Sequence, residues 1–138
     1  MSADCLFCRI VAGTVEASRV YEDEDVVGFL DHHPVFKGHV LLVPREHVVT
    51  LPDLPERLIV PLFAVAQRTA TAMTTALGAQ GTFVAMNNVV SQSVAHLHVH
   101  IVPRTKGDGL RGFFWPRTRY DEGEATTYAE LLRDALKG

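Results

Sequence analysis

The chain has few cysteines, little net charge and no long apolar run. Only two of its 138 residues are cysteine, Cys5 and Cys8, so a framework of several disulfides is excluded. No stretch approaches the roughly 20 consecutive apolar residues that a membrane-spanning helix needs, so we expect no membrane partner. The opening letters, MSADCLFCRI, lack the basic and apolar regions of a signal peptide, and we therefore expect a cytoplasmic protein.

A strong excess of basic charge is also absent. The net charge of −3 excludes broad nucleic-acid binding as a first expectation. The charge is uneven, because the segment PRTKGDGLRGFFWPRTRY (residues 103–120) carries five cations and a single acid. Two interpretations of this segment stay open: it binds a compact anion such as a polyphosphate, or it is a loop with solvated charges that buries its aromatic side chains against the body or a second subunit.

The composition, 47% hydrophobic and 21% charged residues, is typical of a soluble globular protein. The length suits one domain, which we expect over residues 1–138, with a core at 5–104 and a basic, aromatic segment and helix at 105–138. The residue pattern predicts, in chain order, a short helix ending near Gly13, a hairpin over 18–31, a strand over 38–44, a long helix over 55–77, strands over 82–88 and 96–102, and a final helix over 127–138.

These elements predict an α+β domain with a mainly antiparallel five-stranded sheet, one long helix and short terminal helices. The early strands are joined by short turns, which favours antiparallel pairing. Asp53 is expected to cap the long helix, and Thr127 with Glu130 has capping-box spacing in the last helix.

The stretch SVAHLHVHIVPR (residues 93–104) carries three of the seven histidines in five positions. On a strand, the alternation of His96, His98 and His100 with large aliphatic residues puts the three imidazoles on one face and the aliphatics on the other. Spacing leaves three interpretations open. The histidines are polar surface, or neighbouring ones share a metal, or the middle one is a nucleophile that the others orient.

Three motifs, NNVVSQSVAHLHVHIVPR, DHHPVFKGHVLLVPREH and CLFCRI, resemble those of the histidine triad (HIT) family of nucleotide hydrolases and transferases. The resemblance covers most of the chain, from Cys5 to about Arg104. It implies a histidine triad fold that forms a homodimer across a continuous sheet. It also implies attack on the α-phosphate of a purine nucleotide, giving a nucleotidyl-histidine that water resolves.

The resemblance also assigns roles to individual positions. His98 matches the nucleophile, His100 a donor to a phosphate oxygen, and Asp31 the acid that binds the ribose hydroxyls. The remaining matches are the polar pair Gln92 and Ser93 for phosphate and leaving group, Asn87 or Asn88 on the phosphate side, a pocket histidine at His39, and an apolar slot for the base formed by Leu6, Phe7, Ile10 and Phe29.

Bacterial members of the family that bind zinc imply a ligand set of Cys5, Cys8, His47 and His96, and hence one structural zinc per chain. An unliganded or redox-active thiol pair is the alternative. Two departures from the family pattern concern the site. Ser91 stands where glycine is usual, in a loop that is shorter than is common, and His32 occupies a position that is often aliphatic.

Two other functions stay open: a mononuclear zinc hydrolase in which His96 and His98 hold a catalytic metal, and a regulatory module that binds nucleotide without turnover. Dinucleoside polyphosphates and adenosine phosphoramidates share the nucleotide half that the matched residues would contact. The letters PRTKGD after the triad resemble the dinucleoside polyphosphate hydrolases more than the phosphoramidases.

Overall fold

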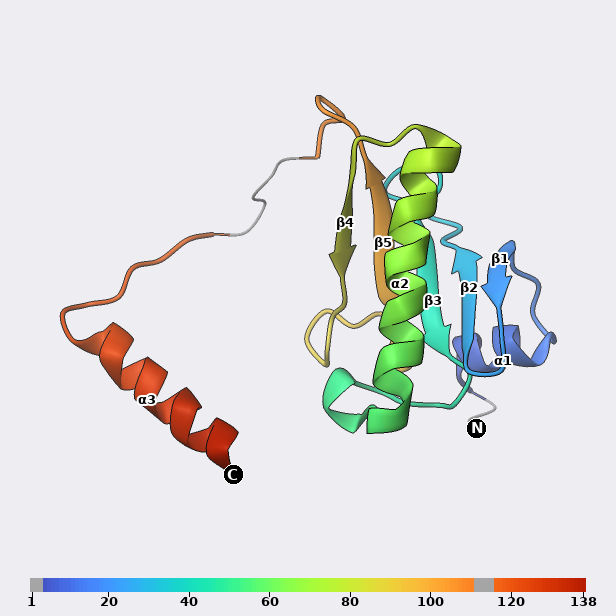
Figure 1. The fold of residues 1–138 in the computed structure, drawn as a ribbon. Helices are drawn as coiled ribbons and strands as arrows, with labels where there is room; N and C mark the ends of the chain where they lie inside the picture. Colours follow the sequence, from blue (N-terminus) through green and yellow to red (C-terminus); the bar gives the residue numbers. More distant parts are fainter. Residues whose placement is uncertain (1–3, 111–115) are drawn as a thin grey trace. The chain divides into compact units, whose positions relative to one another are not determined.

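The computed structural model describes residues 4–110 and 116–138, which form two compact units, Met1–Asp108 and Gly109–Gly138 (Figure 1). The single-domain organisation stays a prediction. The elements of the first unit are, in chain order, α1 (Leu6–Ala12), β1 (Arg19–Glu22), β2 (Val26–Leu30), β3 (Val40–Pro44), a 3-10 turn η1 (Leu51–Asp53), α2 (Glu56–Leu77), β4 (Gly81–Ala85) and β5 (Val99–Arg104). The second unit contains α3 (Glu124–Lys137).

The five strands form one sheet in the order β1-β2-β3-β5-β4, and every neighbouring pair is antiparallel. The predicted α+β fold with an antiparallel five-stranded sheet is therefore confirmed. β5, which carries His100, lies between β3 and β4 and not at an edge of the sheet.

Both faces of the sheet are covered, which explains why β2 and β3 read as almost continuous apolar runs. On one face, Leu42, Val99 and Ile101 pack against α2 (Figure 1). On the other face, Val27, Phe29, Leu41 and Val43 pack with the residues of α1. Because Val99 and Ile101 face α2, His100 between them faces the α1 side.

The long helix ends as expected, because Gly78 adopts the left-handed conformation, with φ 71°, that closes a helix. The predicted cap at Asp53 is wrong. The Asp53 carboxylate instead accepts hydrogen bonds from the backbone N–H and the hydroxyl of Thr50, at 3.3 and 2.7 Å, and so stabilises η1. Pro55 occupies the N-cap of α2.

The predicted strand over 96–102 is shifted in the structure, where β5 begins at Val99. The preceding backbone is engaged elsewhere: the His96 N–H donates to the Val94 carbonyl at 2.8 Å, and the Leu97 N–H donates to the Val48 carbonyl. His96 and His98 therefore precede the ladder. Both are buried, and the predicted division still holds: Leu97 joins Val99 and Ile101 in the cluster on the α2 face, whereas the rings of His96 and His98 contact Phe7 on the α1 side.

In the second unit, α3 begins at Glu124 with Gly123 as its N-cap. The predicted capping box at Thr127 is wrong, because the Thr127 hydroxyl lies within the helix and donates to the Gly123 carbonyl. None of the described helices is long and apolar enough to cross a membrane. The predicted packing of the aromatic run at 113–115 falls outside the described residues.

Candidate functional site

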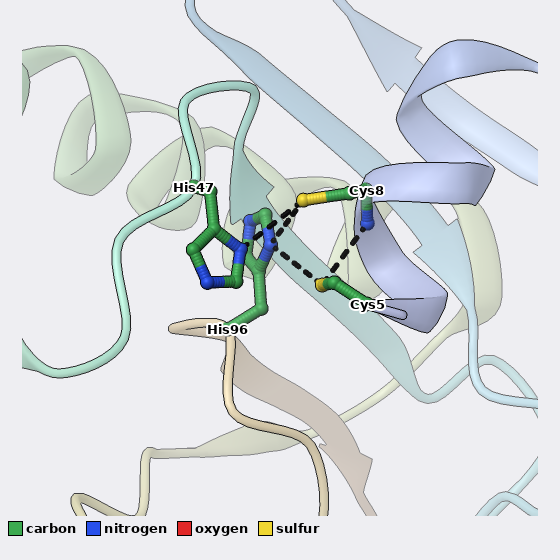
Figure 2. A group of neighbouring side chains, drawn as sticks. All are labelled: Cys5, Cys8, His47 and His96. Atoms are coloured by element: carbon green, nitrogen blue, oxygen red, sulfur yellow. Dashed lines mark hydrogen bonds between the residues drawn. The ribbon is translucent and has the colours of Figure 1, made fainter. Parts of the chain in front are cut away.

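Two cysteines and two histidines meet where the first turn of α1 faces the loops after β3 and before β5 (Figure 2). The Cys8 sulfur lies 3.1 Å from His47 Nδ1 and 3.5 Å from His96 Nδ1. The Cys5 sulfur lies 3.3 Å from the same nitrogen of His96. Cys5 is the N-cap of α1, and its sulfur accepts the Cys8 N–H, so the C-x-x-C spacing turns both sulfurs to one side.

The backbone sets which nitrogen of His96 faces the sulfurs. His96 Nε2 lies 2.8 Å from the Pro44 carbonyl, which can only accept, so Nε2 carries the proton and Nδ1 presents its lone pair to the cysteines. Burial lowers the pKa of His96 to about 4, although the Pro44 carbonyl opposes this fall. A neutral imidazole held by a carbonyl on its other nitrogen is the usual form of a histidine metal ligand.

The four residues fit a tetrahedral metal ion. Their ligand atoms all lie within 4.8 Å of one another. Zinc held by thiolates and imidazoles at its usual bond lengths would separate its ligand atoms by about 3.3 to 3.8 Å. The three sulfur-to-nitrogen distances, 3.1, 3.3 and 3.5 Å, are close to that range. The ligand set that the sequence predicts is thus brought together by the fold.

His98 lies directly beside this cluster but does not belong to it. Its Nδ1 is 2.8 Å from the His96 carbonyl, so Nδ1 carries the proton and Nε2 keeps its lone pair. Nε2 of His98 has no hydrogen-bond partner among the described residues, where every fully buried side-chain nitrogen or oxygen has one, so Nε2 is at least partly accessible to solvent. The structure thus presents one buried imidazole with an accessible lone pair.

A chain of hydrogen bonds fixes the opposite tautomer at His100. The Val35 N–H donates to His39 Nδ1 at 3.1 Å, so His39 carries its proton on Nε2. His39 Nε2 lies 3.0 Å from His100 Nδ1 and donates to it. His100 in its neutral form therefore carries its proton on Nε2 and is a donor there. His98 and His100, with ring centres 5.0 Å apart, offer a lone pair and an N–H side by side.

The surroundings favour the neutral forms of His100 and His39. Burial lowers the pKa of His100 to about 4, and the nearby His98 and His39 add to the fall while Asp31 opposes it. Burial also lowers the pKa of His39, against the pull of the Asp31 carboxylate, whose Oδ2 lies 3.8 Å from His39 Nε2. Asp31 is half-buried, and its Oδ1 accepts the His33 N–H.

In the polar loop before the histidines, predicted site residues form hydrogen bonds to the backbone. Gln92 donates to the Val49 carbonyl at 2.7 Å and accepts the Val89 N–H, while the Asn88 side chain accepts the Leu51 N–H. Ser91 has φ 61° and Val89 has φ 70°, conformations that favour glycine. The left-handed backbone at Ser91 explains why glycine suits this position in the family pattern. Asn87 and Ser93 are exposed.

The predicted base slot falls largely in the core. Phe7, Ile10 and Phe29 are buried in the apolar cluster on the α1 face, and only Leu6 is half-buried. Leu6, Ser93 and His47 line one cleft of about 410 Å³ beside the cysteines. His32 is exposed and lies against His33, with ring centres 4.1 Å apart. The base slot stays a prediction.

A larger apolar cleft, of about 710 Å³, lies between α2 and β1–β2. Its lining contains none of the predicted site residues, and Val40, Val65 and Met73 in it belong to the cluster on the α2 face. This cleft is therefore separated by the sheet from the histidines.

The fold and the site together define a class: an antiparallel α+β domain with a Cys/His cluster next to three further histidines. The chain belongs to the HIT family, since the HIT domain pattern matches residues 12–107, and the family resemblance is confirmed.

Three similar proteins illustrate the range of the family. "Protein hit" of Bacillus subtilis is 38% identical over 122 residues, which cover 86% of this chain and 83% of that protein. The adenosine 5'-monophosphoramidase hnt1 of Schizosaccharomyces pombe is 28% identical over 96% of this chain and 98% of its own length. The crystal structure of a zinc-bound histidine triad family protein from Mycobacterium smegmatis has a TM-score of 0.75 and 37% identity, covering 95% of this chain and 97% of that one.

Sequence reasoning missed the groups that set the tautomers. The carbonyls of Pro44 and His96 and the N–H of Val35 act through the backbone, so their side chains carry no signal. The sequence also does not predict the contact of Phe7 with His98, because the family resemblance assigns Phe7 to the base slot.

The low pKa of His100 predicts a loss of stability in acid. Between its ordinary pKa of 6.5 and its value of about 4, the unfolded chain binds a proton at this residue that the folded chain does not. The free energy of unfolding should therefore fall as pH is lowered through this window, by up to about 1.4 kcal/mol per pH unit from this group. Urea unfolding of the wild type and of His100→Gln from pH 7 to 4 measures the difference, in which the contributions of histidines that do not contact His100 cancel. Equal slopes for the two proteins would contradict the assignment.

Proposed function

We propose that this chain is a nucleotide hydrolase or transferase that cleaves at the α-phosphate of a purine nucleotide through a covalent nucleotidyl-His98. The observation that carries the proposal is the hydrogen bond from His98 Nδ1 to the His96 carbonyl, because it leaves an accessible lone pair on Nε2. A neutral imidazole with its other nitrogen held as a donor is an effective nucleophile near neutral pH.

In the first step, His98 Nε2 gives its lone pair to the α-phosphorus. The N–P bond forms while the bond from phosphorus to the leaving group breaks, and that electron pair goes to the leaving atom. His100 donates its Nε2–H to a non-bridging phosphate oxygen, where negative charge increases in the transition state. Ser93, with Gln92, is the predicted contact on the leaving-group side, where its hydroxyl would donate a hydrogen bond to the leaving atom, and an amine leaving group takes its proton from the solvent.

In the second step, water attacks the phosphorus and the N–P bond breaks, returning the electron pair to Nε2 and releasing a nucleoside monophosphate. Between the two steps His98 is a cation, because its Nδ1 keeps its proton. The His96 carbonyl at 2.8 Å accepts that proton's hydrogen bond and stabilises the charge.

Asp31 would bind the ribose. It is half-buried beside His39, and each carboxylate oxygen retains a lone pair for a hydroxyl donor in addition to its contact within the protein. Asn87 or Asn88 would lie on the phosphate side, and Leu6, Phe7, Ile10 and Phe29 would line the base slot. Dinucleoside polyphosphates and adenosine phosphoramidates are both candidates. The sequence PRTKGD favours the first, and the relative named as a phosphoramidase favours the second.

The Cys/His cluster would hold one structural zinc. When bound, zinc would supply a closed crosslink between α1 and the loops that carry His47 and His96, with no position left for a reacting water. This differs from a mononuclear zinc hydrolase with His96 and His98 as ligands, because the cluster gathers His96 with two cysteines and His47 and does not include His98.

Zinc content tests the cluster. Protein prepared without added metal should contain about one zinc per chain by elemental analysis, since the four ligands form a complete tetrahedral set. Cys8→Ser should lose the metal, whereas His33→Ala, which changes an exposed histidine outside the cluster, should keep it. Because zinc binds the folded chain, 100-fold saturation would stabilise it by about 2.7 kcal/mol, which chelation would remove. A wild type that contains no zinc, and whose free energy of unfolding chelation does not change, would rule out the zinc site.

The covalent intermediate tests the reaction. His98→Ala should lose on the order of 10⁴-fold or more in kcat, since the chemical route itself is removed. His100→Ala should be less severe, and His33→Ala should retain turnover. Because an N–P bond to histidine is labile in acid, reactions of the wild type are quenched in alkali and the peptides are weighed by mass spectrometry. Nucleotide on a residue other than His98, or turnover by His98→Ala, would contradict the mechanism and favour a metal-bound hydroxide.

We also propose a homodimer that pairs the two β4 edges into one sheet. β4 is an edge strand, Val84 on it is 47% exposed, and Ile59 and Phe63 are exposed on α2, which contacts β4. Sedimentation should show a dimer for the wild type and a monomer for Val84→Lys. The matched control is Val20→Lys at the opposite edge, which should stay dimeric. A monomeric wild type, or dissociation by Val20→Lys, would contradict this interface.

A further inference from the structure

Phe7 lies between the two cysteines and contacts the proposed nucleophile. Its ring centre is 5.0 Å from that of His98, and the two ring planes stand at 85°. Phe29 supports Phe7 from another side, with ring centres 5.3 Å apart. Only 5% of Phe7 is exposed, so little of its ring can touch a bound base.

The hydrogen bond to the His96 carbonyl fixes only one atom of the His98 ring. The ring can still rotate about this contact unless neighbouring side chains restrain it. A perpendicular aromatic neighbour at this distance is a favoured arrangement and limits such rotation. If the ring turned away from the carbonyl, nothing would hold the proton on Nδ1. A proton on Nε2 would then remove the lone pair that attacks phosphorus.

We propose that Phe7 is a positioning residue that keeps His98 in its Nδ1–H form with Nε2 directed to the substrate. As an aid to catalysis, the inference rests on the proposed function. It extends that function, because the sequence pattern assigns Phe7 to the base slot, whereas its contacts assign it to the nucleophile.

The same geometry links the nucleophile to the cluster. Cys5 and Cys8 flank Phe7 in the first turn of α1, and the Cys8 N–H donates to the Cys5 sulfur. Fixing both sulfurs therefore fixes the turn that carries the Phe7 ring. His96 provides a second connection, since its ring meets the sulfurs and its carbonyl accepts the His98 proton. A metal at this cluster would thus hold His98 from two sides.

Long-range proton–nitrogen NMR of protein with ¹⁵N-labelled histidine reads the tautomer of His98 without any substrate, and His98→Gln assigns its signals. In the wild type, His98 should carry its proton on Nδ1. In Phe7→Leu it should become a mixture of both tautomers while zinc content stays unchanged. Should Phe7→Leu fail to fold, Phe7→Met places a flexible, unbranched apolar side chain there instead of the ring, and it should give the same mixture of tautomers.

The matched control is Val27→Ala, which removes buried apolar volume from the same cluster without a ring contact to His98. It should leave the tautomer and kcat unchanged. An unchanged tautomer in the Phe7 variants, an equal change in Val27→Ala, or a change that added zinc reverses would overturn the proposal.

The kinetic comparison separates positioning from base binding. Loss of positioning should lower kcat by on the order of 10- to 100-fold and leave KM within about twofold, because the nucleophile and not the nucleotide is misplaced. The loss should be the same for adenosine and uridine phosphoramidates. A raised KM with normal kcat would assign Phe7 to the base slot and overturn the proposal. If no nucleotide is turned over, the proposed function fails, while the NMR result still decides whether Phe7 orients His98.

Discussion

A single hydrogen bond, from His98 Nδ1 to the His96 carbonyl at 2.8 Å, determines what the site can do. It leaves a lone pair on Nε2 of a ring that is otherwise enclosed by the protein. It also connects two sites, because the residue that supplies the carbonyl directs its own ring to the cysteines. The Cys/His cluster lies close to the proposed nucleophile because His96, which belongs to the cluster, and His98 are two residues apart in the chain.

The sheet makes this arrangement possible by separating two kinds of interior. On the α2 face the buried residues are aliphatic apart from Met73, with Tyr21 packed against them, and this face supplies much of the burial that stabilises the fold. On the α1 face, cysteines and histidines are buried beside apolar side chains. Buried polar groups are costly without partners, and here the carbonyls of Pro44 and His96 and the N–H of Val35 provide them. Burial in turn keeps His96 and His100 neutral, as a metal ligand and a directional donor require.

The residue pattern predicts the fold class, and the motifs that resemble those of the HIT family predict the family and the residues of the Cys/His cluster. The predictions are wrong where backbone hydrogen bonds determine the structure. Alternation alone predicts a strand from residue 96, whereas the Leu97 N–H donates to the Val48 carbonyl outside the ladder. Asp53 does not cap α2, because its carboxylate accepts a hydrogen bond from the Thr50 hydroxyl three residues earlier. The unusual Ser91 was visible in the sequence, but only its φ of 61° shows why glycine suits the position.

The central claim, that His98 takes the nucleotide onto its accessible nitrogen before water does, is tested most directly by the stereochemistry at phosphorus. The substrate is an adenosine phosphorothioate of known configuration at the α-phosphorus, hydrolysed by the wild type in ¹⁸O-labelled water. Attack by His98 and then by water inverts the phosphorus twice, so the account predicts a product with retained configuration. Inversion would show that water attacks the substrate in one step and would contradict the account.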